Sequence, residues 1–340
     1  NSYYKSGELI GRQGLEKSYE KELRGIKGVK YFQKDKFNRI TNSYKDGLFD
    51  TLIVPANDIR LSIDIVLQRY GDSLMKNKFG SIIAIEPSSG EILSLINSPS
   101  FNPNLLIGRN RSKNYLRLKN DPIGKPLFDR GLQGQYPPGS PFKLVNGLIG
   151  LQENIINNKT TIRCNEGHFY SKNRFMRCHC KIGTINNLNK AIYNSCNTFF
   201  ANIYKKTLDK FPNSKLGIDN WKKHIESFGF GNYLGYDHPI GRPGLIPGSN
   251  YYDKLYPNGG WKAATTISNG IGQGEILTTP IQLANLTAII ANRGWYRTPH
   301  LVKKISKKSL KEKYTEKNFT TIDSIHFEKI IEGMFNVIQK

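Results

Sequence analysis

One short stretch constrains this chain more than any other, namely Tyr136-Pro137-Pro138-Gly139-Ser140-Pro141-Phe142-Lys143. Its prolines have a fixed φ and its glycine can take conformations that other residues avoid, so the backbone must reach Ser140 through an extended, tight turn. Ser140 suits the N-cap of a helix and Pro141 suits the first helical position, which predicts that a helix begins at the serine itself. We therefore expect the Ser140 hydroxyl at the positive end of a helix dipole.

Lys143 follows one helical turn after Ser140. Residues three apart share a helix face, so we expect the lysine amine close to the serine hydroxyl. A hydroxyl beside an amine that can take its proton is a nucleophile with its base. The S-x-x-K spacing also occurs at Ser18 and Ser73, but only at Ser140 does a tight turn precede it and an apolar helical run, residues 144–151, follow it.

Size and charge limit the class of protein. With 340 residues, 38% of them hydrophobic, the chain can bury a large core and form more than one domain. No apolar run approaches the roughly 20 residues of a membrane span, and no signal-peptide pattern opens the chain, so we expect any membrane anchor to lie outside it. The net charge of +23 suits an anionic partner. The lysines are dispersed without a nucleic-acid motif, however, so we expect no nucleic-acid partner.

The first sixty residues differ in character from the rest. They are polar and glycine-rich, with a short helix expected at 19–25 that a glycine closes, and short strands expected at 30–40 and 47–54. This pattern predicts a packing or linker domain without recognisable chemistry.

From residue 61 onward, apolar segments dominate. A short strand at 61 passes into a helix that reaches about residue 77, and apolar strands at 81–87 and 91–97 flank Ser88-Ser89-Gly90, a hairpin signal. We expect this hairpin in a central antiparallel sheet. Helical patterns prevail after residue 141, including 185–204, 220–227 and 280–291.

Several further segments are similar to motifs of a known family and occur in its order. They are Gly11-Arg12-Gln13-Gly14-Leu15-Glu16, Leu23-Arg24-Gly25, Ile63-Asp64, Leu67-Gln68, Ala84-Ile85-Glu86-Pro87, Gly90-Glu91-Ile92-Leu93, Tyr136 to Lys143, Ala191-Ile192, Ser195-Cys196-Asn197, Gly272-Gln273-Gly274 and Thr279-Pro280-Ile281-Gln282-Leu283-Ala284. Together they resemble the class B penicillin-binding proteins, and most closely the penicillin-binding protein 2 group of the elongation machinery.

The resemblance implies a fold class and a domain division. The fold is α+β, the penicillin-binding and serine β-lactamase-like transpeptidase fold, in which an antiparallel sheet has helices on both sides and a helical subdomain. Residues 1–60 are expected to form part of an N-terminal packing or dimerisation domain, the pedestal. Residues 61–340 are expected to form a transpeptidase domain that is incomplete at its C-terminus.

The second motif of the family, S-x-N, has several matches. It occurs at Ser100, Ser112, Ser171 and Ser195, but only Ser195 follows a helical run and precedes side chains expected in the core. By resemblance, Ser195 relays protons between the lysine and the leaving amine, and Asn197 binds the peptide backbone of the substrate. A hydroxyl and an amide can do this without adding charge to the pocket.

The resemblance also implies substrate contacts at Gly272, Gln273 and Gly274. The third motif of the family, K-[ST]-G, supplies a cation for the substrate carboxylate and a backbone N–H for the oxyanion hole, yet no K-[ST]-G follows Ser140. The chain stops at Lys340, about where the family leads into that strand, so we expect a truncated product with an unpaired sheet edge. Loss of one oxyanion donor is expected to cost ~10²–10³ in rate.

All four cysteines lie close together in the sequence, at Cys164, Cys178, Cys180 and Cys196, with His168 and His179 between them. Four thiolates suit a tetrahedral structural zinc ion, and a histidine is an alternative ligand. Two disulfides or free thiols are the competing interpretations. We favour zinc, because Cys196 lies between the two residues of the second motif and a metal there holds that loop in place.

The resemblance implies a mechanism. A neutral Lys143, its pKa lowered by desolvation, takes the proton of Ser140, which attacks the bond between the terminal D-alanines of a peptidoglycan stem peptide. D-Alanine leaves with a proton from Ser195, and the amine of a neighbouring stem resolves the ester into a crosslink. β-Lactams mimic the donor and trap Ser140. No catalytic cofactor is needed.

Partners and location follow from the same resemblance. We expect stem peptides and β-lactams as ligands, a RodA-type glycosyltransferase and elongation-complex proteins as partners, and a location at the inner membrane facing the periplasm. The alternatives are a division-type class B penicillin-binding protein, a β-lactam sensor or hydrolase, and a catalytically incomplete scaffold without K-[ST]-G.

Overall fold

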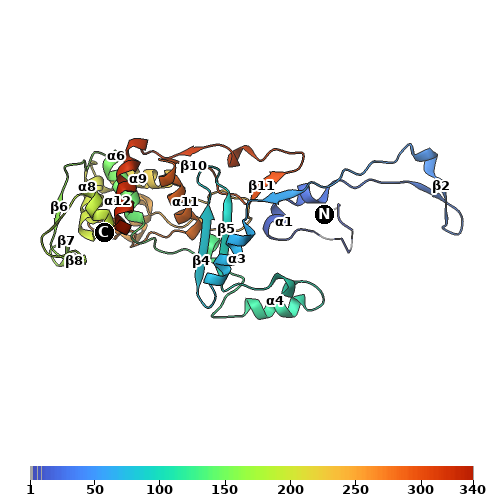
Figure 1. The fold of residues 1–340 in the computed structure, drawn as a ribbon, viewed down its shortest axis with the longest axis horizontal. Helices are drawn as coiled ribbons and strands as arrows, with labels where there is room; N and C mark the ends of the chain where they lie inside the picture. The colour runs from blue at the N-terminus through green and yellow to red at the C-terminus, as the bar shows by residue number, and fades with distance from the viewer. Residues whose placement is uncertain (1–2, 6, 9, 340) are drawn as a thin grey trace.

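The computed structural model describes residues 3–5, 7–8 and 10–339. The molecule is elongated: the N-terminal elements form a narrow extension at one end, and a helical block forms the other (Figure 1). Between them lies a hairpin of two strands, β4 and β5, with helices on either side (Figure 1). In the part of the chain that the structure describes, no helix is long and apolar enough to cross a membrane.

The N-terminal extension is built from short elements. They are α1 (Gly14–Ser18), α2 (Glu20–Arg24), β1 (Phe32–Lys34), β2 (Ile40–Ser43), the 3-10 turn η1 (Tyr44–Gly47) and β3 (Ile59–Leu61). The helix expected at 19–25 is confirmed, and it ends at Gly25 with φ +64°. The strand expected at 47–54 is wrong, because Lys45 and Asp46 turn the backbone with positive φ and the segment contributes only isolated bridges, Val54 to Ile26 and Thr51 to Val29.

The predicted hairpin is confirmed as β4 (Gly80–Ile85) paired antiparallel with β5 (Ile92–Ser98). Helix α3 (Ile65–Leu74) lies against it, and the end of the Ile96 side chain occupies the space beside Gly71 that a Cβ would otherwise fill. Strands β4 and β5 form a two-stranded antiparallel sheet, and Glu91, just before β5, forms an isolated bridge with His300. The elements that follow are η2 (Pro103–Leu106), α4 (Arg111–Lys119) and α5 (Arg130–Gln133).

The helical block contains the largest core. Its helices are α6 (Phe142–Gln152), α7 (Leu188–Tyr193), α8 (Asn197–Asp209), α9 (Ser214–Ser227), α10 (Ser249–Leu255), η3 (Ile267–Ile271), α11 (Pro280–Ala291), η4 (Glu312–Tyr314), η5 (Ser324–His326) and α12 (Phe327–Gln339). Its strands are β6 (Ile162–Cys164), β7 (Gly167–Ser171), β8 (Arg174–Arg177), β9 (Thr184–Asn186), β10 (Trp295–Tyr296) and β12 (Asn318–Phe319). Strand β11 (Val302–Ile305) lies outside the block and pairs antiparallel with β3. The centre of the core is aromatic: Trp221 packs edge-on against Phe142 and Tyr204.

Two of the predicted helices need correction. The helix expected at 185–204 is interrupted, with α7 ending at Tyr193 and α8 beginning at Asn197, because Ser195 has a left-handed backbone with φ +48°. The helix expected at 220–227 is the second half of α9, which begins earlier at Ser214. The helix expected at 280–291 is confirmed as α11. The α+β fold class is also confirmed, since helices and strands pack together throughout the chain.

Candidate active site

The proline-glycine turn delivers Ser140 just before α6. The helix begins at Phe142 with Pro141 as its N-cap, so the prediction that Ser140 caps the helix is wrong. The turn is held instead by the backbone: Gly139 has φ +64°, and its N–H donates to the Gly272 carbonyl over 2.8 Å. Phe142, which is fully buried, anchors the helix start in the core. The Ser140 hydroxyl is thereby released from capping and can bond elsewhere.

Lys143 points from the first turn of α6 into the interior and is 3% exposed. Its Nζ donates to the Ser195 carbonyl at 2.7 Å, to Ser195 Oγ at 2.9 Å and to Asn197 Oδ1 at 2.7 Å. Ser195 Oγ in turn donates to Ser140 Oγ at 2.9 Å. The spacing predicted the amine close to Ser140, and the described hydrogen bonds connect the two groups through the Ser195 hydroxyl.

Burial also sets the protonation of the lysine. Desolvation lowers the pKa of Lys143 from its ordinary 10.5 to about 8, although the nearby cysteine sulfurs act in the opposite direction. A buried amine is costly to charge, because the surrounding protein cannot solvate the ammonium as water does. A substantial fraction of the amine is therefore neutral near physiological pH and able to accept a proton.

Ser195 owes its position to the break between α7 and α8. The Ser195 N–H donates to the Ile192 carbonyl, and the Cys196 N–H donates to the Ala191 carbonyl, each over 2.9 Å. These bonds close α7 as a left-handed C-terminal turn, with the serine at a φ that non-glycine residues seldom adopt. A strained backbone persists where surrounding contacts hold it in place. In this conformation, both the carbonyl and the hydroxyl oxygen of Ser195 accept hydrogen bonds from Lys143.

Asn197, the other half of the S-x-N motif, is the first residue of α8. Its Oδ1 accepts from Lys143, and its Nδ2 donates to the Arg177 carbonyl at the end of β8 over 2.8 Å. Its backbone N–H donates to Cys178 Sγ at 3.2 Å. The side chain is thus held on both sides. The four residues predicted as catalytic, Ser140, Lys143, Ser195 and Asn197, form one hydrogen-bonded cluster.

The glycine pair of Gly272-Gln273-Gly274 has a clear steric role. A Cβ at Gly272 would lie 2.2 Å from the Gly139 carbonyl oxygen, and the backbone there has φ +72°, so only glycine fits beside the serine turn. Gln273 donates its N–H to the Ser268 carbonyl, and Gly274 lies beside Asn269. The structure therefore brings Gly272 against the nucleophile turn, while Gln273 and Gly274 continue away from it.

Sequence reasoning missed Asn146, which lies one turn after Lys143 and is 2% exposed. Its Nδ2 donates to the Gly270 carbonyl at 3.1 Å, and its Oδ1 accepts from Trp221 Nε1 at 2.8 Å. Asn146 thus ties the nucleophile helix to η3, whose end at Gly272 supports the serine turn. The signal was available, since Asn146 is the polar residue inside an apolar run.

The four cysteines come together beside the S-x-N loop. All are buried, and their sulfurs lie within 4.8 Å of one another. Cys178 Sγ is 3.6 Å from Cys180 and 3.8 Å from Cys196, so the thiols are not paired as disulfides. The hydrogen bond shared by the Cys178 and Cys196 sulfurs lowers the pKa of Cys178 from its ordinary value.

The two nearby histidines lie outside this cluster. His179 Nε2 is 2.7 Å from the Asn194 carbonyl, and His168 Nδ1 is 3.3 Å from Asn202 Nδ2. The sulfur spacings agree with a tetrahedron around zinc, where Zn–S bonds of about 2.3 Å put sulfurs about 3.8 Å apart. The residues present therefore fit a Cys₄ zinc site.

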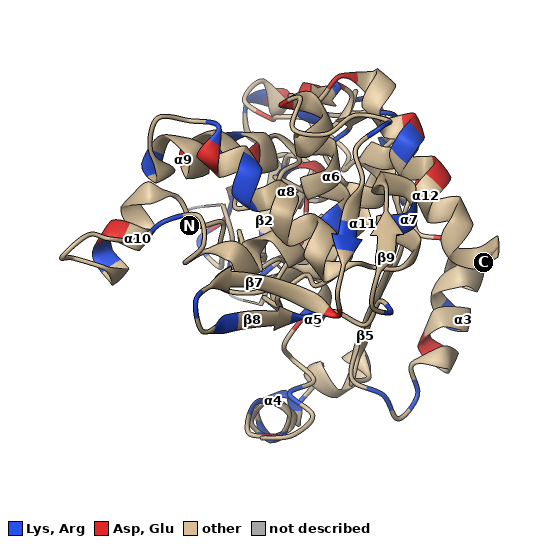
Figure 2. Cartoon of the chain, turned by 90° about the vertical axis from the view of Figure 1, so that its left-hand side faces the viewer, with Lys and Arg blue, Asp and Glu red and all other residues tan. Residues whose placement is uncertain are grey.

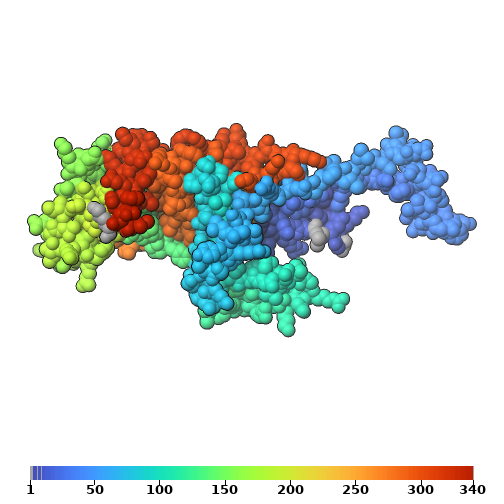
Figure 3. Space-filling view, viewed as in Figure 1, coloured from blue at the N-terminus to red at the C-terminus, as the bar shows by residue number. Residues whose placement is uncertain are grey.

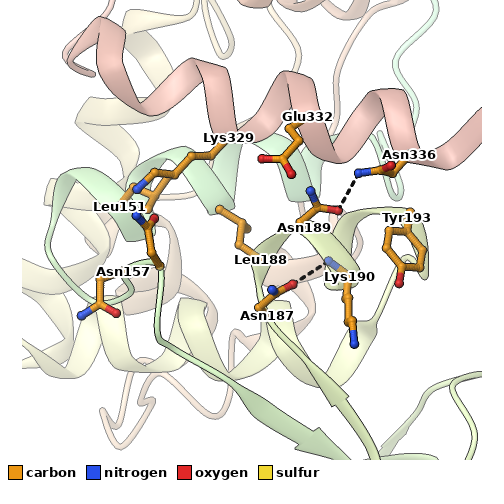
Figure 4. Close-up of a pocket in the computed structure, with 11 residues that line it drawn as sticks. Leu151, Asn157, Asn187, Leu188, Asn189, Lys190, Tyr193, Lys329, Glu332 and Asn336 are labelled. Atoms are coloured by element: carbon orange, nitrogen blue, oxygen red, sulfur yellow. Dashed lines mark hydrogen bonds between the residues drawn. The ribbon is translucent and has the colours of Figure 1, made fainter.

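A cavity of about 340 Å³ lies beside α7. Asparagine side chains from α7, α12 and the loop after α6 line it, together with Lys329 and Glu332 (Figure 4). The Asn336 amide donates to Asn189 Oδ1 across this cavity at 3.0 Å (Figure 4). None of Ser140, Lys143, Ser195 and Asn197 lines it.

The sequence matches known protein families over most of its length. Residues 80–340 match the family described as penicillin binding protein transpeptidase domain, and residues 1–61 match the penicillin-binding protein dimerisation domain. The chain is similar to the peptidoglycan D,D-transpeptidase MrdA of Acinetobacter baumannii, with 37% identity over 303 residues, which are 88% of this chain and 43% of that protein. The chain spans about half the length of the curated relatives it matches, 43% to 52% of the first three.

Solved structures agree with this match. PBP2 of Pseudomonas aeruginosa, solved in complex with WCK 5153, has a TM-score of 0.79 and 30% identity, covering 97% of this chain and 68% of that one. PBP2 of Helicobacter pylori, solved in complex with MreC, also has a TM-score of 0.79 and 30% identity, covering 96% of this chain and 57% of that one. The match over residues 80–340, which are more than half of the chain, shows that this chain belongs to the penicillin-binding protein transpeptidase family.

Proposed function

We propose that this chain carries the acyl-transfer centre of a peptidoglycan D,D-transpeptidase of the elongation type. The observation that supports this most is the continuous hydrogen-bond path from Lys143 Nζ through Ser195 Oγ to Ser140 Oγ. It joins a buried amine of lowered pKa to a hydroxyl at the end of a rigid turn, which is how a serine nucleophile is activated. Similarity to the MrdA proteins supports the substrate class.

The proton path gives the order of events. Ser140 Oγ attacks the carbonyl carbon of the bond between the two terminal D-alanines of a stem peptide. Its proton passes to Ser195 Oγ, and the Ser195 proton passes to the neutral Lys143 amine; hydroxyl hydrogens can rotate to reverse the direction of each bond. When the tetrahedral adduct collapses, the same path returns a proton to the nitrogen of the leaving D-alanine. The amine of a neighbouring stem then attacks the ester and forms the crosslink.

Asn197 and the glycine turn position the substrate in this proposal. Asn197 is held by Lys143 and by the Arg177 carbonyl, so its amide is preoriented for a peptide backbone. Gly272, which lies against the serine turn, and the following Gln273 and Gly274 are further substrate contacts in this proposal. β-Lactams acylate Ser140 by the same path.

We also propose that the cysteine cluster holds structural zinc through Cys164, Cys178, Cys180 and Cys196. Zinc bound there supplies no chemistry to the reaction; it holds the end of β8 against the start of α8. The support is the spacing of the four sulfurs. Metal analysis of the purified protein is expected to find one zinc ion per chain, and a chain that binds none while keeping four thiols would refute the assignment.

The remaining elements of the proposal concern context. Residues 1–60 are part of a pedestal domain and residues 61–340 are the transpeptidase domain. The protein acts at the inner membrane, with this part facing the periplasm, and works with a RodA-type glycosyltransferase and other elongation proteins. The H. pylori relative in complex with MreC supports such partners.

Intact-protein mass after incubation with a labelled penicillin tests the function. One adduct on the chain, absent from Ser140→Ala, is expected. Ser73→Ala is the matched control, since Ser73 also stands three residues before a lysine but lies on the exposed end of α3, and it should acylate like the unmodified chain. An adduct that persists in Ser140→Ala would refute the assigned nucleophile. An absent adduct in every variant would instead favour a non-catalytic scaffold for this chain.

A further inference from the structure

The β7–β8 hairpin presents two faces of opposite character. In its register, Phe169 pairs with Phe175 and His168 pairs with Met176. Met176 packs on the main core and His168 meets Asn202 of α8, so this face is turned inward. Side chains alternate along a strand, which puts Phe169, Phe175 and Arg177 together on the outer face.

The outer face carries an exposed aromatic pair. The rings of Phe169 and Phe175 lie 4.6 Å apart between centroids, yet Phe169 is 69% exposed and Phe175 40% exposed. A Cβ at Gly167 would lie 2.3 Å from the Phe175 ring, so the absence of a side chain at Gly167 allows the ring to lie across the strand pair. Exposed apolar rings that are held in place this way are typical of binding surfaces.

Basic side chains surround these rings. Lys172 and Arg174 lie at the hairpin turn, and Arg177 follows Phe175 on the same face; all three are exposed. Figure 2 shows blue segments on β8 and at the turn before it. The ion pairs among the described residues include none of these three. Their charge is therefore available to an anionic ligand.

This face is continuous with the active site. The carbonyl of Arg177 accepts from Asn197 Nδ2 at 2.8 Å, and the next residue, Cys178, accepts from the Asn197 N–H. The strand that carries the outer face is thus hydrogen-bonded at its end to the asparagine that contacts Lys143. We propose that the outer face of β7–β8 is a subsite for the peptidoglycan strand that carries a reacting stem peptide.

The chemistry of that strand matches the surface. Sugar rings present C–H faces that stack on aromatic rings, and stem peptides carry carboxylates that pair with a planar guanidinium. Penicillin has neither a glycan strand nor a stem peptide, so in this proposal the subsite contributes to binding of the polymer and not to acylation by penicillin. The inference rests on the proposed transpeptidase function, because it assigns the surface to the same substrate.

Binding of the complete protein to soluble, uncrosslinked glycan strands bearing pentapeptides tests the subsite, beside acylation by penicillin in the same preparations. Phe169→Ser with Phe175→Ser, and separately Arg174→Gln, are expected to weaken strand binding by about tenfold, as loss of an aromatic or arginine anchor does. Acylation should stay within about twofold of the unmodified protein, because these changes leave Arg177, whose carbonyl accepts from Asn197, in place.

Matched controls separate this effect from a general one. Phe319→Ser removes a ring that is also 69% exposed but lies on β12, and Arg117→Gln removes an exposed arginine on α4. Both should bind strands normally. Equal binding by the hairpin variants and the unmodified protein would overturn the subsite, as would equal losses in the controls. If no form of the protein is acylated by penicillin, the proposed function fails, and the strand-binding comparison remains a separate result.

Discussion

Residues 26–54 and the helices around Ser140 both contain many apolar side chains. These side chains are exposed in the first region and buried in the second. In the extension, Leu48 is 77% exposed and Leu52 is 91% exposed, and β1 and β2 are exposed along their whole length. Around the nucleophile, Phe142 and Val145 are both 0% exposed. Figure 3 shows the extension as a thin arm beyond the thick helical body.

This difference in burial explains why the hydrogen-bonded cluster lies in the helical block and not in the arm. In the arm, contacts are local, between segments close in sequence such as β1 and β2. In the helical block, α6 packs against α8, α9 and η3, which come from distant parts of the chain. Interiors packed at crystal-like density hold side chains in single rotamers, and a hydrogen-bonded path such as Lys143–Ser195–Ser140 depends on that rigidity.

Removal of the buried amine is the strongest test of the comparison. Lys143→Ala is expected to lower the rate of penicillin acylation by about 10³-fold, within the range for loss of a general base. Lys45→Ala on the exposed turn of the arm is the control and should leave the rate unchanged. Stopped-flow measurement with a fluorescent penicillin gives both rates. A Lys143→Ala chain that acylates at more than about a tenth of the normal rate would contradict the assigned base.

Removal of an aromatic ring should lower the free energy of unfolding much more in the helical block than in the arm. Trp221→Ala removes a fully buried ring that packs on Phe142, and we expect it to lower the free energy of unfolding by about 3–5 kcal/mol. Phe37→Ala removes a ring that is 65% exposed in the arm and should change stability by less than about 0.5 kcal/mol. Urea unfolding, followed by far-ultraviolet circular dichroism, measures the free energy of unfolding of both variants. Similar losses at the two positions would show that the arm is as tightly packed as the block.

Loss of one cysteine tests whether metal joins the hairpin to the catalytic loop. Cys196→Ser is expected to abolish zinc binding and to lower the free energy of unfolding by about 3 kcal/mol, because a structural metal contributes its binding energy to folding. Acylation should also slow, since Cys196 lies between Ser195 and Asn197. Metal content and acylation are measured on one preparation. Thr184→Ala, on the nearby strand β9, is the control and should retain zinc.

The smallest expected effect is the pH dependence of acylation, which follows from the burial of Lys143. Burial lowers the pKa of Lys143 to about 8, and the neutral amine is the base, so acylation should rise with pH through this value and then level off. From roughly pH 9 to roughly pH 7 the rate is expected to fall about tenfold. Between about 8 and 10.5 the unfolded chain binds more protons at this site than the folded chain, so stability contributed by Lys143 rises with pH in that window. A rate that is flat from pH 6 to pH 9 would contradict the lowered pKa.

Much of the local structure could be predicted from residue patterns. The hairpin at 81–87 and 91–97 and the helix at 280–291 were correct because alternation of apolar residues and a capping sequence act within a few residues. The helix predicted across 185–204 was wrong, because its apolar pattern continues through Ser195 while hydrogen bonds from Lys143 and the turn after α7 hold that serine at positive φ. Asn146 was missed for a related reason: its partners, Gly270 and Trp221, are distant in the chain.

The sequence by itself determined which residue types meet at the site: a serine after a proline-glycine turn, a lysine one turn later, an S-x-N motif and four cysteines. Only the tertiary structure decided how they connect. Packing of α6 against α8 buries Lys143 and gives it Ser195 and Asn197 as partners instead of Ser140 directly. The spacing of Ser140 and Lys143 determines only how these two residues lie along one helix. The proton path also depends on the distance between α6 and α8, and the side chains packed between the two helices set that distance.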